Sequence, residues 1–465
     1  MRKVGLLTIH VSKKFGVPLD RFFLDTSLLE LDGEFTKAPK VVPGRGRNSF
    51  SQLIASLTAA AGSRIPIKSE LWPGNTFDGH TLPNAFKAID RVAPPGSIEL
   101  IMDRAFPTLS NILFLQNQWD KRPCYWISPL KTGLAGKHFK NLVFSIWESN
   151  SWQLIEYRSA KEIRDKIPPS LTAYETTWVL KEEIKPELDP GQKRRPNGSI
   201  RHVEIPVRCV IFRHEERAVN EKTGREANRK KLDMALQGFQ KKINLRSLKT
   251  VEACENSLRT LLNGYKQIKS FVNVVFSTNE HNSVIMNWTW DEVALAHEEK
   301  LDGIFALLTN YDADRVSANK LIKKYRERNQ IEVNFKDLKG LLDLERIFLQ
   351  LPERIEAYVF PKTLAYFVLA FLRWYAEEKG GIKTTEKKIQ ESFGDMLLIG
   401  NKIQLLDLTA YSLGNDTSLA EWFWTTLGLP NPIKVVDELN SETLVLLDQA
   451  IDDWYKTWLD QNAIN

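Results

Sequence analysis

The sequence is poor in cysteine, and its three cysteines, Cys124, Cys209 and Cys254, stand singly. No Cys-x-x-Cys pair occurs, which argues against a zinc ribbon and against a disulfide framework. Unpaired cysteines are typical of a reducing compartment, so a cytoplasmic protein is expected. Nothing near the N-terminus reads as a signal peptide, because polar residues break its apolar run. The most apolar later stretch, AYFVLAFLRWYA, is too short to span a bilayer, so no membrane partner is predicted.

The charge of the chain is unevenly distributed. The 465 residues include 43% hydrophobic and 26% charged side chains, which is ordinary for a globular protein and excludes a wholly disordered or collagen-like chain. Residues 190–250 contain 16 Lys and Arg against six Asp and Glu, whereas residues 391–465 contain three Lys and 12 Asp and Glu. The basic middle predicts a polyanionic partner, with nucleic acid as the first candidate. On charge alone, a solvated basic face explains it equally well.

The order of predicted elements indicates an α/β sheet. DRFFLDTSLLEL reads as a strand, and QLIASLTAAA and IPIKSELW read as a hairpin joined by a turn at residues 62–64. LPNAFKAIDRV reads as a helix, and IELIMD and CYWISPL as two further strands. From about residue 140 to 300 the pattern of predicted elements changes to strands separated by loops and by a basic helical stretch. This change predicts an inserted domain. A long helix is then expected from about Ser317 to Leu342.

Two aspartates occupy unusual places in these predicted strands. Asp25 lies in the middle of an apolar strand, and Asp103 ends the apolar run IELIM. A buried carboxylate is costly unless it is paired or binds a cation. Asp103 alone is also explained as a strand-end residue that accepts local backbone hydrogen bonds. Two such aspartates and one helical glutamate are the ligands that a two-metal phosphoryl-transfer site needs.

The predicted long helix carries a line of polar residues. Tyr325, Arg328, Glu332 and Lys339 fall within one sector of about 60° if the helix is uninterrupted. The neighbouring sector is apolar and contains Ile331, Phe335, Leu338 and Leu342. Spacing alone favours an ordinary surface helix with charge pairs such as Arg328–Glu332.

Together, these blocks resemble the DDE transposases of bacterial insertion sequences that carry the signature Tyr-x2-Arg-x3-Glu-x6-Lys. The signature reads YRERNQIEVNFKDLK here, with all four residues at the right spacing. LDTS matches the first catalytic block of that family, PIKSELWPGNTFD its middle segment, and MDRA its second catalytic block. The resemblance covers roughly residues 20–375.

The resemblance implies an RNase H-like mixed sheet flanked by helices, with an inserted mostly β domain and a helical C-terminal region. It implies a metal-binding catalytic triad of Asp25, Asp103 and Glu332 that holds two Mg²⁺ ions, with Mn²⁺ as a substitute. Tyr325, Arg328 and Lys339 would hold DNA-end phosphates. Further DNA contacts are expected from basic residues elsewhere in the chain, namely Arg104, Lys193, Arg194, Arg195, Arg229, Lys230 and Lys231. The expected segments are 1–138 (first part of the catalytic core), 139–300 (insertion), 301–378 (remainder of the core) and 379–465 (acidic helices).

The implied activity is cut-and-paste transposition on double-stranded DNA, by a homodimer associated with the bacterial nucleoid. Two departures from the family pattern stand out: Asp25 lies close to the start, where relatives place a DNA-binding domain, and Ala105 replaces a glycine. The alternatives are therefore a truncated, catalytically silent copy that binds DNA or regulates a relative, and another RNase H-like nuclease such as a resolvase, which the signature disfavours.

Three further features have plain structural interpretations. We interpret Asp302 as a turn cap, and Trp288 and Trp290 as core aromatics rather than as a stacking site for a displaced base. The seven histidines form no zinc-like cluster, so no structural metal is predicted.

Overall fold

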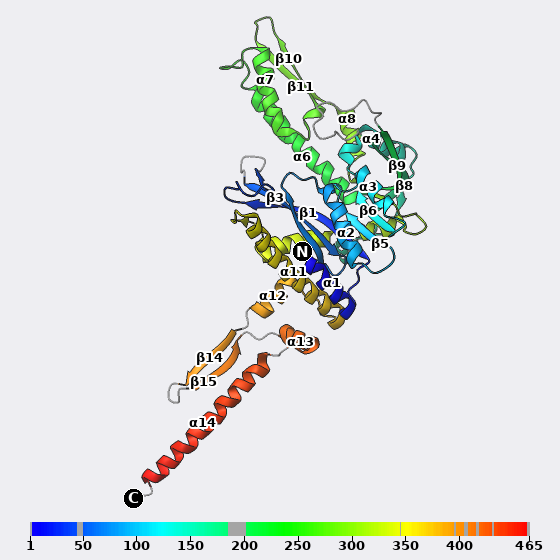
Figure 1. Ribbon diagram of the computed structural model, residues 1–465. Coiled ribbons are helices and arrows are strands. Elements are labelled where there is room, and N and C mark those ends of the chain that lie inside the picture. The colour runs from blue at the N-terminus through cyan, green and yellow to red at the C-terminus, as the bar shows by residue number, and fades with distance from the viewer. Residues whose placement is uncertain are drawn as a thin grey trace. The chain divides into compact units, whose positions relative to one another are not determined.

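The computed structural model of the chain describes residues 2–43, 50–184, 201–344, 346–394, 397–403, 408–414, 418–429 and 432–462. The chain is divided into two compact units. One unit contains Met1–Gly96 and Glu327–Asn465, and the other contains Ser97–Arg326. The first unit is therefore built from both ends of the sequence, which Figure 1 shows in blue and in yellow to red.

The first unit contains a mixed sheet, and its central strand β1 (Arg21–Leu31) carries Asp25. β1 pairs antiparallel with β3 (Ser51–Ala60), which pairs antiparallel with β4 (Pro66–Pro73). Two short strands complete the sheet: β2 (Val42–Pro43) pairs with β3, and β13 (Arg346–Ile347) runs parallel to β1. The predicted strand and hairpin are confirmed.

Helices flank this sheet, and α2 and α11 pack against β4. α2 has the predicted bounds, and the C-terminal region contains a hairpin, β14–β15, that the sequence did not suggest. Phe15 of the first helix packs against Phe371, with the two rings tilted by 53° and their centroids 5.0 Å apart. The helices and the hairpin of this unit are α1 (Arg2–Phe15), η1 (Asp78–Thr81), α2 (Leu82–Val92), α10 (Asn329–Lys336), η4 (Asp337–Leu341), α11 (Pro352–Gly380), α12 (Glu386–Gly394), β14 (Leu397–Ile403), β15 (Leu408–Gly414), α13 (Ser418–Leu427) and α14 (Pro432–Asn462).

Helix α11 is, by length and composition, the one helix among the described residues that is apolar enough to cross a membrane. It includes the apolar stretch that alone is too short to do so. Its Val359, Tyr366 and Phe367 are buried in this unit. It also carries a buried arginine, Arg373, whose side chain is 6% exposed. These features are typical of a core helix.

Arg373 belongs to a buried ion cluster that holds the β3–β4 turn. Its Nε lies 3.0 Å from Glu386 Oε1, and its Nη2 donates to the carbonyl oxygens of Gly62 (3.1 Å) and Ser63 (2.8 Å). Arg64, in the same turn, is ion-paired with Glu386 as well. Gly62 and Arg64 both have positive φ, at 79° and 62°. The cluster therefore fixes a turn whose backbone conformation is otherwise unfavourable for arginine.

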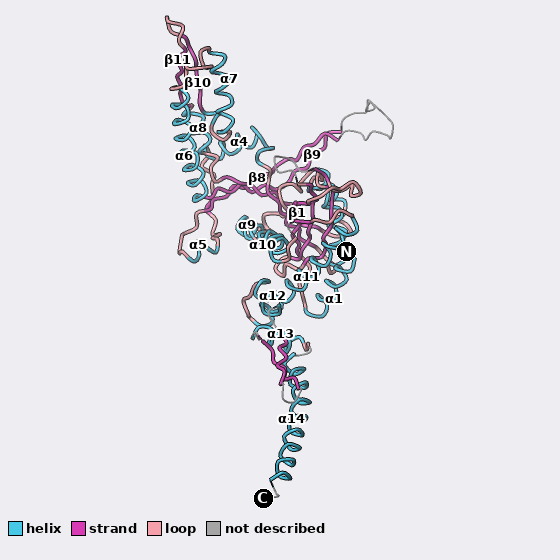
Figure 2. Tube along the Cα trace, turned by 90° about the vertical axis from the view of Figure 1, so that its left-hand side faces the viewer, coloured by secondary structure: helices cyan, strands magenta, loops and turns pink. Residues whose placement is uncertain are grey.

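The second unit contains strands that pair in both parallel and antiparallel directions. β5 (Ile98–Met102) runs parallel to β6 (Cys124–Pro129), and β6 is antiparallel to β12 (Ile304–Thr309). The sheet continues antiparallel through β9 (Arg201–His214), β8 (Leu171–Ile184) and β7 (Gln153–Leu154), and β8 and β9 form the long ribbon seen in Figure 2. The helices packed around it are α3 (Leu109–Asn117), α4 (Thr132–Glu148), α5 (Ala160–Arg164) and α9 (Ala318–Arg326).

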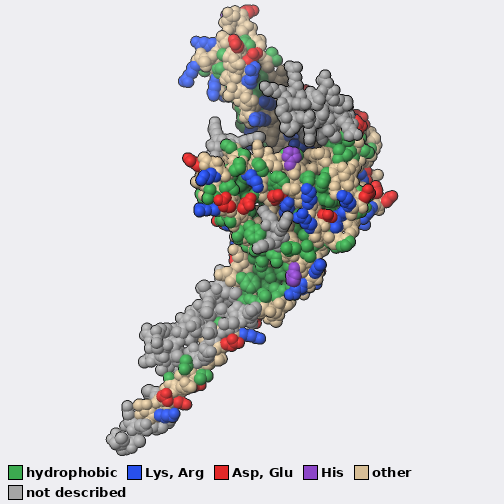
Figure 3. Space-filling view, in the orientation of Figure 1, with side chains coloured by type: hydrophobic (Ala, Val, Ile, Leu, Met, Phe, Trp, Pro, Cys, Tyr) green, Lys and Arg blue, Asp and Glu red, His purple; other side chains and the backbone are tan. Residues whose placement is uncertain are grey.

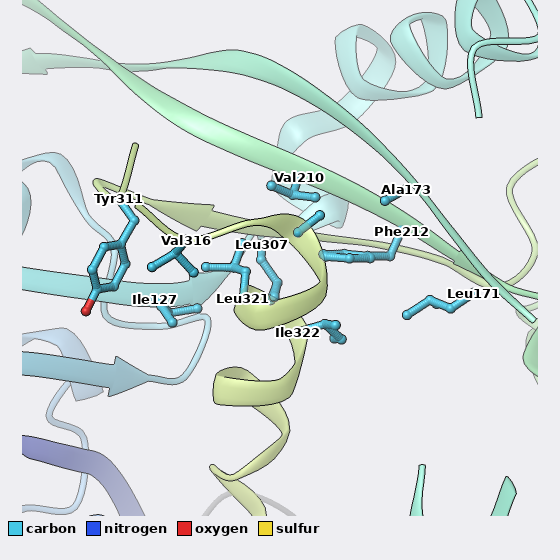
Figure 4. Close-up of a cluster of buried hydrophobic side chains, with 11 residues drawn as sticks. Ile127, Leu171, Ala173, Val210, Phe212, Leu307, Tyr311, Val316, Leu321 and Ile322 are labelled. Carbon is cyan, nitrogen blue, oxygen red and sulfur yellow. The ribbon is translucent and has the colours of Figure 1, made fainter. Parts of the chain in front are cut away.

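The hydrophobic core of this unit lies between α9 and the sheet. Figure 4 shows Leu321 of α9 directed toward Ile127, Val210 and Leu307 of the strands. All four side chains are completely buried. The element order, three antiparallel strands in the first unit and then two parallel strands separated by α3, is the order that an RNase H-like fold requires.

A second core forms around α6, which the sequence marked as a basic helical stretch. Figure 1 shows α6 beside α7 and the hairpin β10–β11. Leu232, Leu236, Cys254 and Met286 are buried in this core. The region expected to be mostly β thus contains long helices as well as strands. Its elements are α6 (Glu215–Gln240), α7 (Val251–Leu262), η2 (Asn263–Tyr265), η3 (Lys269–Phe271), β10 (Val272–Thr278), β11 (Val284–Trp290) and α8 (Glu292–Glu299).

The buried ion cluster generates a stability prediction. Replacing Arg373 with Met removes the guanidinium and leaves Glu386 buried with only part of its counter-charge. We expect the free energy of unfolding to fall by about 3–5 kcal/mol, the usual cost of breaking a buried pair by removing one partner. Chemical denaturation measures this loss. The control is Lys387→Met, which removes an exposed partner of Glu391 and should cost less than about 1 kcal/mol; equal losses would contradict the prediction.

Candidate active site

The carboxylate of Asp25 is held in the middle of β1 by two contacts. Its Oδ1 accepts the backbone N–H of Thr26 at 2.8 Å, and its Oδ2 lies 3.4 Å from Nη1 of Arg328. The side chain is only 15% exposed. Burial of this charge is therefore compensated by a nearby cation, as its place in an apolar strand requires.

Glu332 meets the same arginine from the first turn of α10. Its Oε1 lies 2.7 Å from Nη2 of Arg328, whose own side chain is 13% exposed, whereas the Glu332 side chain is 56% exposed. A carboxylate in the first turn of a helix is also favoured by the helix dipole. Arg328 and Asp25 are separated by 303 residues in the sequence. Two members of the predicted triad thus come together on one guanidinium within the first unit.

Asp103 follows β5 directly and belongs to the second unit. Its backbone oxygen accepts the hydroxyl of the buried Ser128 at 2.8 Å and the N–H of Phe106 at 3.1 Å. These bonds fix the chain where it leaves the sheet, and Arg104, the next residue, is exposed. The approach of the Asp103 carboxylate to Asp25 and Glu332 stays a prediction.

The donor set can be compared with the needs of a divalent cation. Within the described ranges, no three His, Cys, Asp or Glu side chains are grouped closely enough to hold a metal ion. Asp25 and Glu332 nevertheless place hard carboxylate oxygens around one positive charge. Mg²⁺ is commonly held by one or two protein carboxylates, with water and phosphate oxygens completing its shell. This pair fits such an ion.

The expectation of one uninterrupted signature helix is wrong. α9 ends at Arg326, α10 begins at Asn329, and η4 continues from α10 as a π-helical turn. At the break, the N–H groups of Gln330 and Ile331 bond carbonyls three residues back, at 3.0 and 2.9 Å, rather than four. The side chain of Glu327, at this point, is ion-paired with Arg21 of β1. The break thus coincides with a tertiary contact to β1.

The break separates the signature residues into different surroundings. Tyr325 is partly buried and packs against the hydrophobic core of the second unit. Lys339 lies in η4 of the first unit and is partly buried. The predicted apolar face is confirmed, because Ile331, Phe335 and Leu338 are buried with at most 8% exposure.

A second buried carboxylate, Glu99 in β5, escaped the sequence analysis. Its Oε2 lies 2.7 Å from Nζ of Lys324 and accepts the hydroxyl of Tyr311. Burial, reinforced by the charge of Glu99, raises the pKa of Tyr311 well above its usual range. The apolar run IELIM could have predicted this pairing, because a buried glutamate needs a charged or hydrogen-bonding partner just as a buried aspartate does.

The predicted basic residues of the insertion have different surroundings. Lys193, Arg194 and Arg195 lie outside the described residues. Arg229 is paired with Glu292, with 3.1 Å between Nη1 and Oε2, and its guanidinium lies 4.8 Å from the ring centre of Trp290. The hydrogen bond to Glu292 raises the pKa of Arg229.

Exposed basic side chains are numerous in the same region. Figure 3 shows Lys and Arg side chains on the surface of the part that contains α6, α7 and β10–β11. The exposed basic residues of α6 and the segment after it include Lys230, Lys231, Lys241, Lys242, Arg246 and Lys249. These side chains are exposed to solvent, whereas Arg229 is paired with Glu292.

Trp288 and Trp290 are held within the insertion core, as interpreted from the sequence. Both indole N–H groups donate to Oδ1 of Asp233, each at 3.0 Å. Asp302 does more than cap a turn: it is buried and accepts Nη1 of Arg225 at 2.8 Å and Nη2 at 2.5 Å. These bonds raise the pKa of Arg225.

Comparisons with known proteins identify the family. The family model described as "Transposase DDE domain" matches residues 22–368, which is most of the chain, and the chain belongs to this family. A solved piggyBac transposase, in a synaptic complex with hairpin DNA, is 8% identical with a TM-score of 0.36, and the match covers 80% of this chain. The chain spans 51% of that piggyBac chain. Mos1 transposase, in a paired-end complex with a left transposon end, is 14% identical with a TM-score of 0.16, over 26% of this chain and 40% of Mos1. No curated protein sequence matches the chain.

The Asp233 contacts generate a second stability prediction. Replacing Asp233 with Ala leaves two partly buried indole N–H groups without their acceptor. We expect a loss of about 1–3 kcal/mol in the free energy of unfolding, measured by chemical denaturation. Glu226→Ala, which removes the same charge from an exposed position of α6, is the matched control. A loss no larger than that of the control would mean that the two tryptophans are held by packing alone.

Proposed function

We propose that this DDE transposase family member is an active nuclease and strand transferase that acts on the ends of a bacterial insertion sequence by a metal-dependent cut-and-paste route. The observation that carries the proposal is the meeting of Asp25 and Glu332, from opposite ends of the sequence, on the single cation of Arg328. The pairing gathers two hard carboxylates, 307 residues apart in the sequence, at one place, which is what a metal-dependent phosphoryl-transfer site needs.

Each residue of the site has an assigned role in the proposal. Asp25, Asp103 and Glu332 would hold two Mg²⁺ ions, with Mn²⁺ as a substitute. When bound, such ions activate an attacking water or hydroxyl and stabilise the leaving oxygen. Arg328 provides a planar fork that suits a phosphate, and Lys339 lies in the segment that follows α10. The carboxylates of Asp25 and Glu332 orient Arg328 before DNA arrives.

The proposed substrate is double-stranded DNA, bound by a homodimer. The exposed lysines of α6 support a contact with the phosphate backbone, because such contacts position a protein on DNA without reading its sequence.

The catalytic assignment is tested by single substitutions in the triad. Asp25→Asn, Asp103→Asn and Glu332→Gln should each lower cleavage of terminal-repeat DNA about a thousandfold or more, because bound metal contributes several kcal/mol to the barrier. Cleavage of labelled DNA in Mg²⁺ or Mn²⁺ measures this. Asp20→Asn, at an exposed position just before β1, should cleave normally. DNA binding without cleavage by the unsubstituted protein would favour the catalytically silent copy.

The basic surface of α6 gives a salt-dependence prediction. Lys230→Gln together with Lys231→Gln should weaken DNA binding and lower the slope of log K against log salt by up to about 2, because each phosphate contact contributes about 0.9. Fluorescence anisotropy over a salt series measures the slope. Arg229→Gln should change stability more than the slope, since its guanidinium is already paired with Glu292. The matched control is the double variant Lys387→Gln, Lys388→Gln on α12. If this control changes DNA binding equally, the α6 lysines act only through the net charge of the protein and make no specific contact.

A further inference from the structure

Arg328 stands between the two carboxylates of the first unit in the way that a metal ion would. Its two terminal nitrogens point to different partners, Nη1 to Asp25 and Nη2 to Glu332, at 3.4 and 2.7 Å. The other oxygen of Asp25 accepts a backbone N–H from Thr26. The Asp25 oxygen that faces Glu332 through the guanidinium, Oδ2, is therefore the one that a divalent ion would share in place of Arg328.

A guanidinium and a divalent cation compete for such a position. Arginine remains protonated in proteins, so Arg328 cannot relieve the repulsion by losing a proton. An ion bound by Asp25 Oδ2 and Glu332 Oε1 would lie within a few ångströms of the Arg328 guanidinium, which is paired with both of these oxygens in the DNA-free protein. Binding of the ion therefore requires the guanidinium to move.

The structure offers a way for this exchange to occur. Glu332 is 56% exposed, so the outer end of the site opens to solvent, whereas Arg328 and Asp25 are largely covered. A phosphate is a stronger bidentate partner for arginine than the single contacts it makes here. A DNA phosphate brought to the open side would draw the guanidinium away from the carboxylates.

We propose that Arg328 is the resident cation of the Asp25–Glu332 pair in the DNA-free protein, and that a DNA phosphate displaces it and so admits the divalent ion. The inference rests on the proposed function, because it takes these two carboxylates as metal ligands. It adds that metal loading is coupled to DNA binding through one side chain. By linkage, DNA tightens metal binding and metal tightens DNA binding by the same factor.

The test is a titration of the full chain with Mn²⁺, in which electron paramagnetic resonance reports the free ion. Without DNA, Arg328→Ala should bind Mn²⁺ about tenfold more tightly than the unsubstituted protein, because one competing charge is gone. Arg328→Gln, a second neutral variant, should behave alike if the alanine variant folds poorly. Arg328→Lys keeps the charge and should remain weak. Adding duplex DNA should tighten Mn²⁺ binding by the unsubstituted protein about tenfold more than it tightens binding by Arg328→Ala, because only the unsubstituted protein has a guanidinium to displace.

Controls separate this inference from the proposed function. Arg346→Ala removes an exposed arginine on β13, opposite Glu30 of β1, about 16 Å along the strand from Asp25, and should not alter Mn²⁺ binding. If Asp25→Asn abolishes Mn²⁺ binding but neutral variants of Arg328 do not strengthen it, the metal site stands and the resident-cation inference is overturned. If Asp25→Asn and Glu332→Gln both bind Mn²⁺ like the unsubstituted protein, the proposed metal site itself fails.

Discussion

The hydrogen bonds that buried Arg373 donates to the β3–β4 turn support α10, the helix that carries Glu332. α10 rests on this turn through two side chains one helical turn apart: Gln330 accepts the N–H of Gly62 at 3.0 Å, and Asn334 donates to the carbonyl of Arg64 at 3.1 Å. Asn334 in turn accepts the hydroxyl of Tyr366 at 2.8 Å. These contacts pair backbone groups of the turn and hold α10, with Glu332, against β1.

The proposed metal site poses an electrostatic problem, because its carboxylates must lie close together and the protein must remain folded without the ions. Asp25 is largely covered and lies in an apolar strand, where an unpaired charge would be costly. Arg328 supplies the missing counter-charge from within the signature itself. In the proposed mechanism the same residue stabilises the metal-free protein and later binds phosphate, and the two roles follow one another because one guanidinium cannot serve both partners.

The sequence predicted well those elements whose positions depend on residues close to one another in the chain. The sequence predicted the hairpin β3–β4, with its turn at residues 62–64, to within one residue at each strand end, and helix α2 with its observed bounds. Asp25 was found because its neighbours are apolar. The break before α10 could not be found in this way, because it accompanies the pairing of Glu327 with Arg21, 306 residues away in the sequence. The Glu99–Lys324 contact likewise joins residues 225 apart, beyond the reach of any periodicity.

The break also changes how the signature must be understood. A spacing of four residues remains within one helical turn, so Arg328, which caps α10 with helical dihedrals, and Glu332 stay coupled whether or not the preceding helix is continuous. Tyr325 and Lys339 are seven residues away from Glu332 on either side, and such a spacing places side chains on one face only if the helix between them is unbroken. Tyr325 is instead held by the core of the second unit, and Lys339 by the π-helical turn of the first. Arg328 and Glu332 therefore keep their relative positions through local helical geometry, and Arg328 contacts Asp25. The positions of Tyr325 and Lys339 depend on tertiary packing.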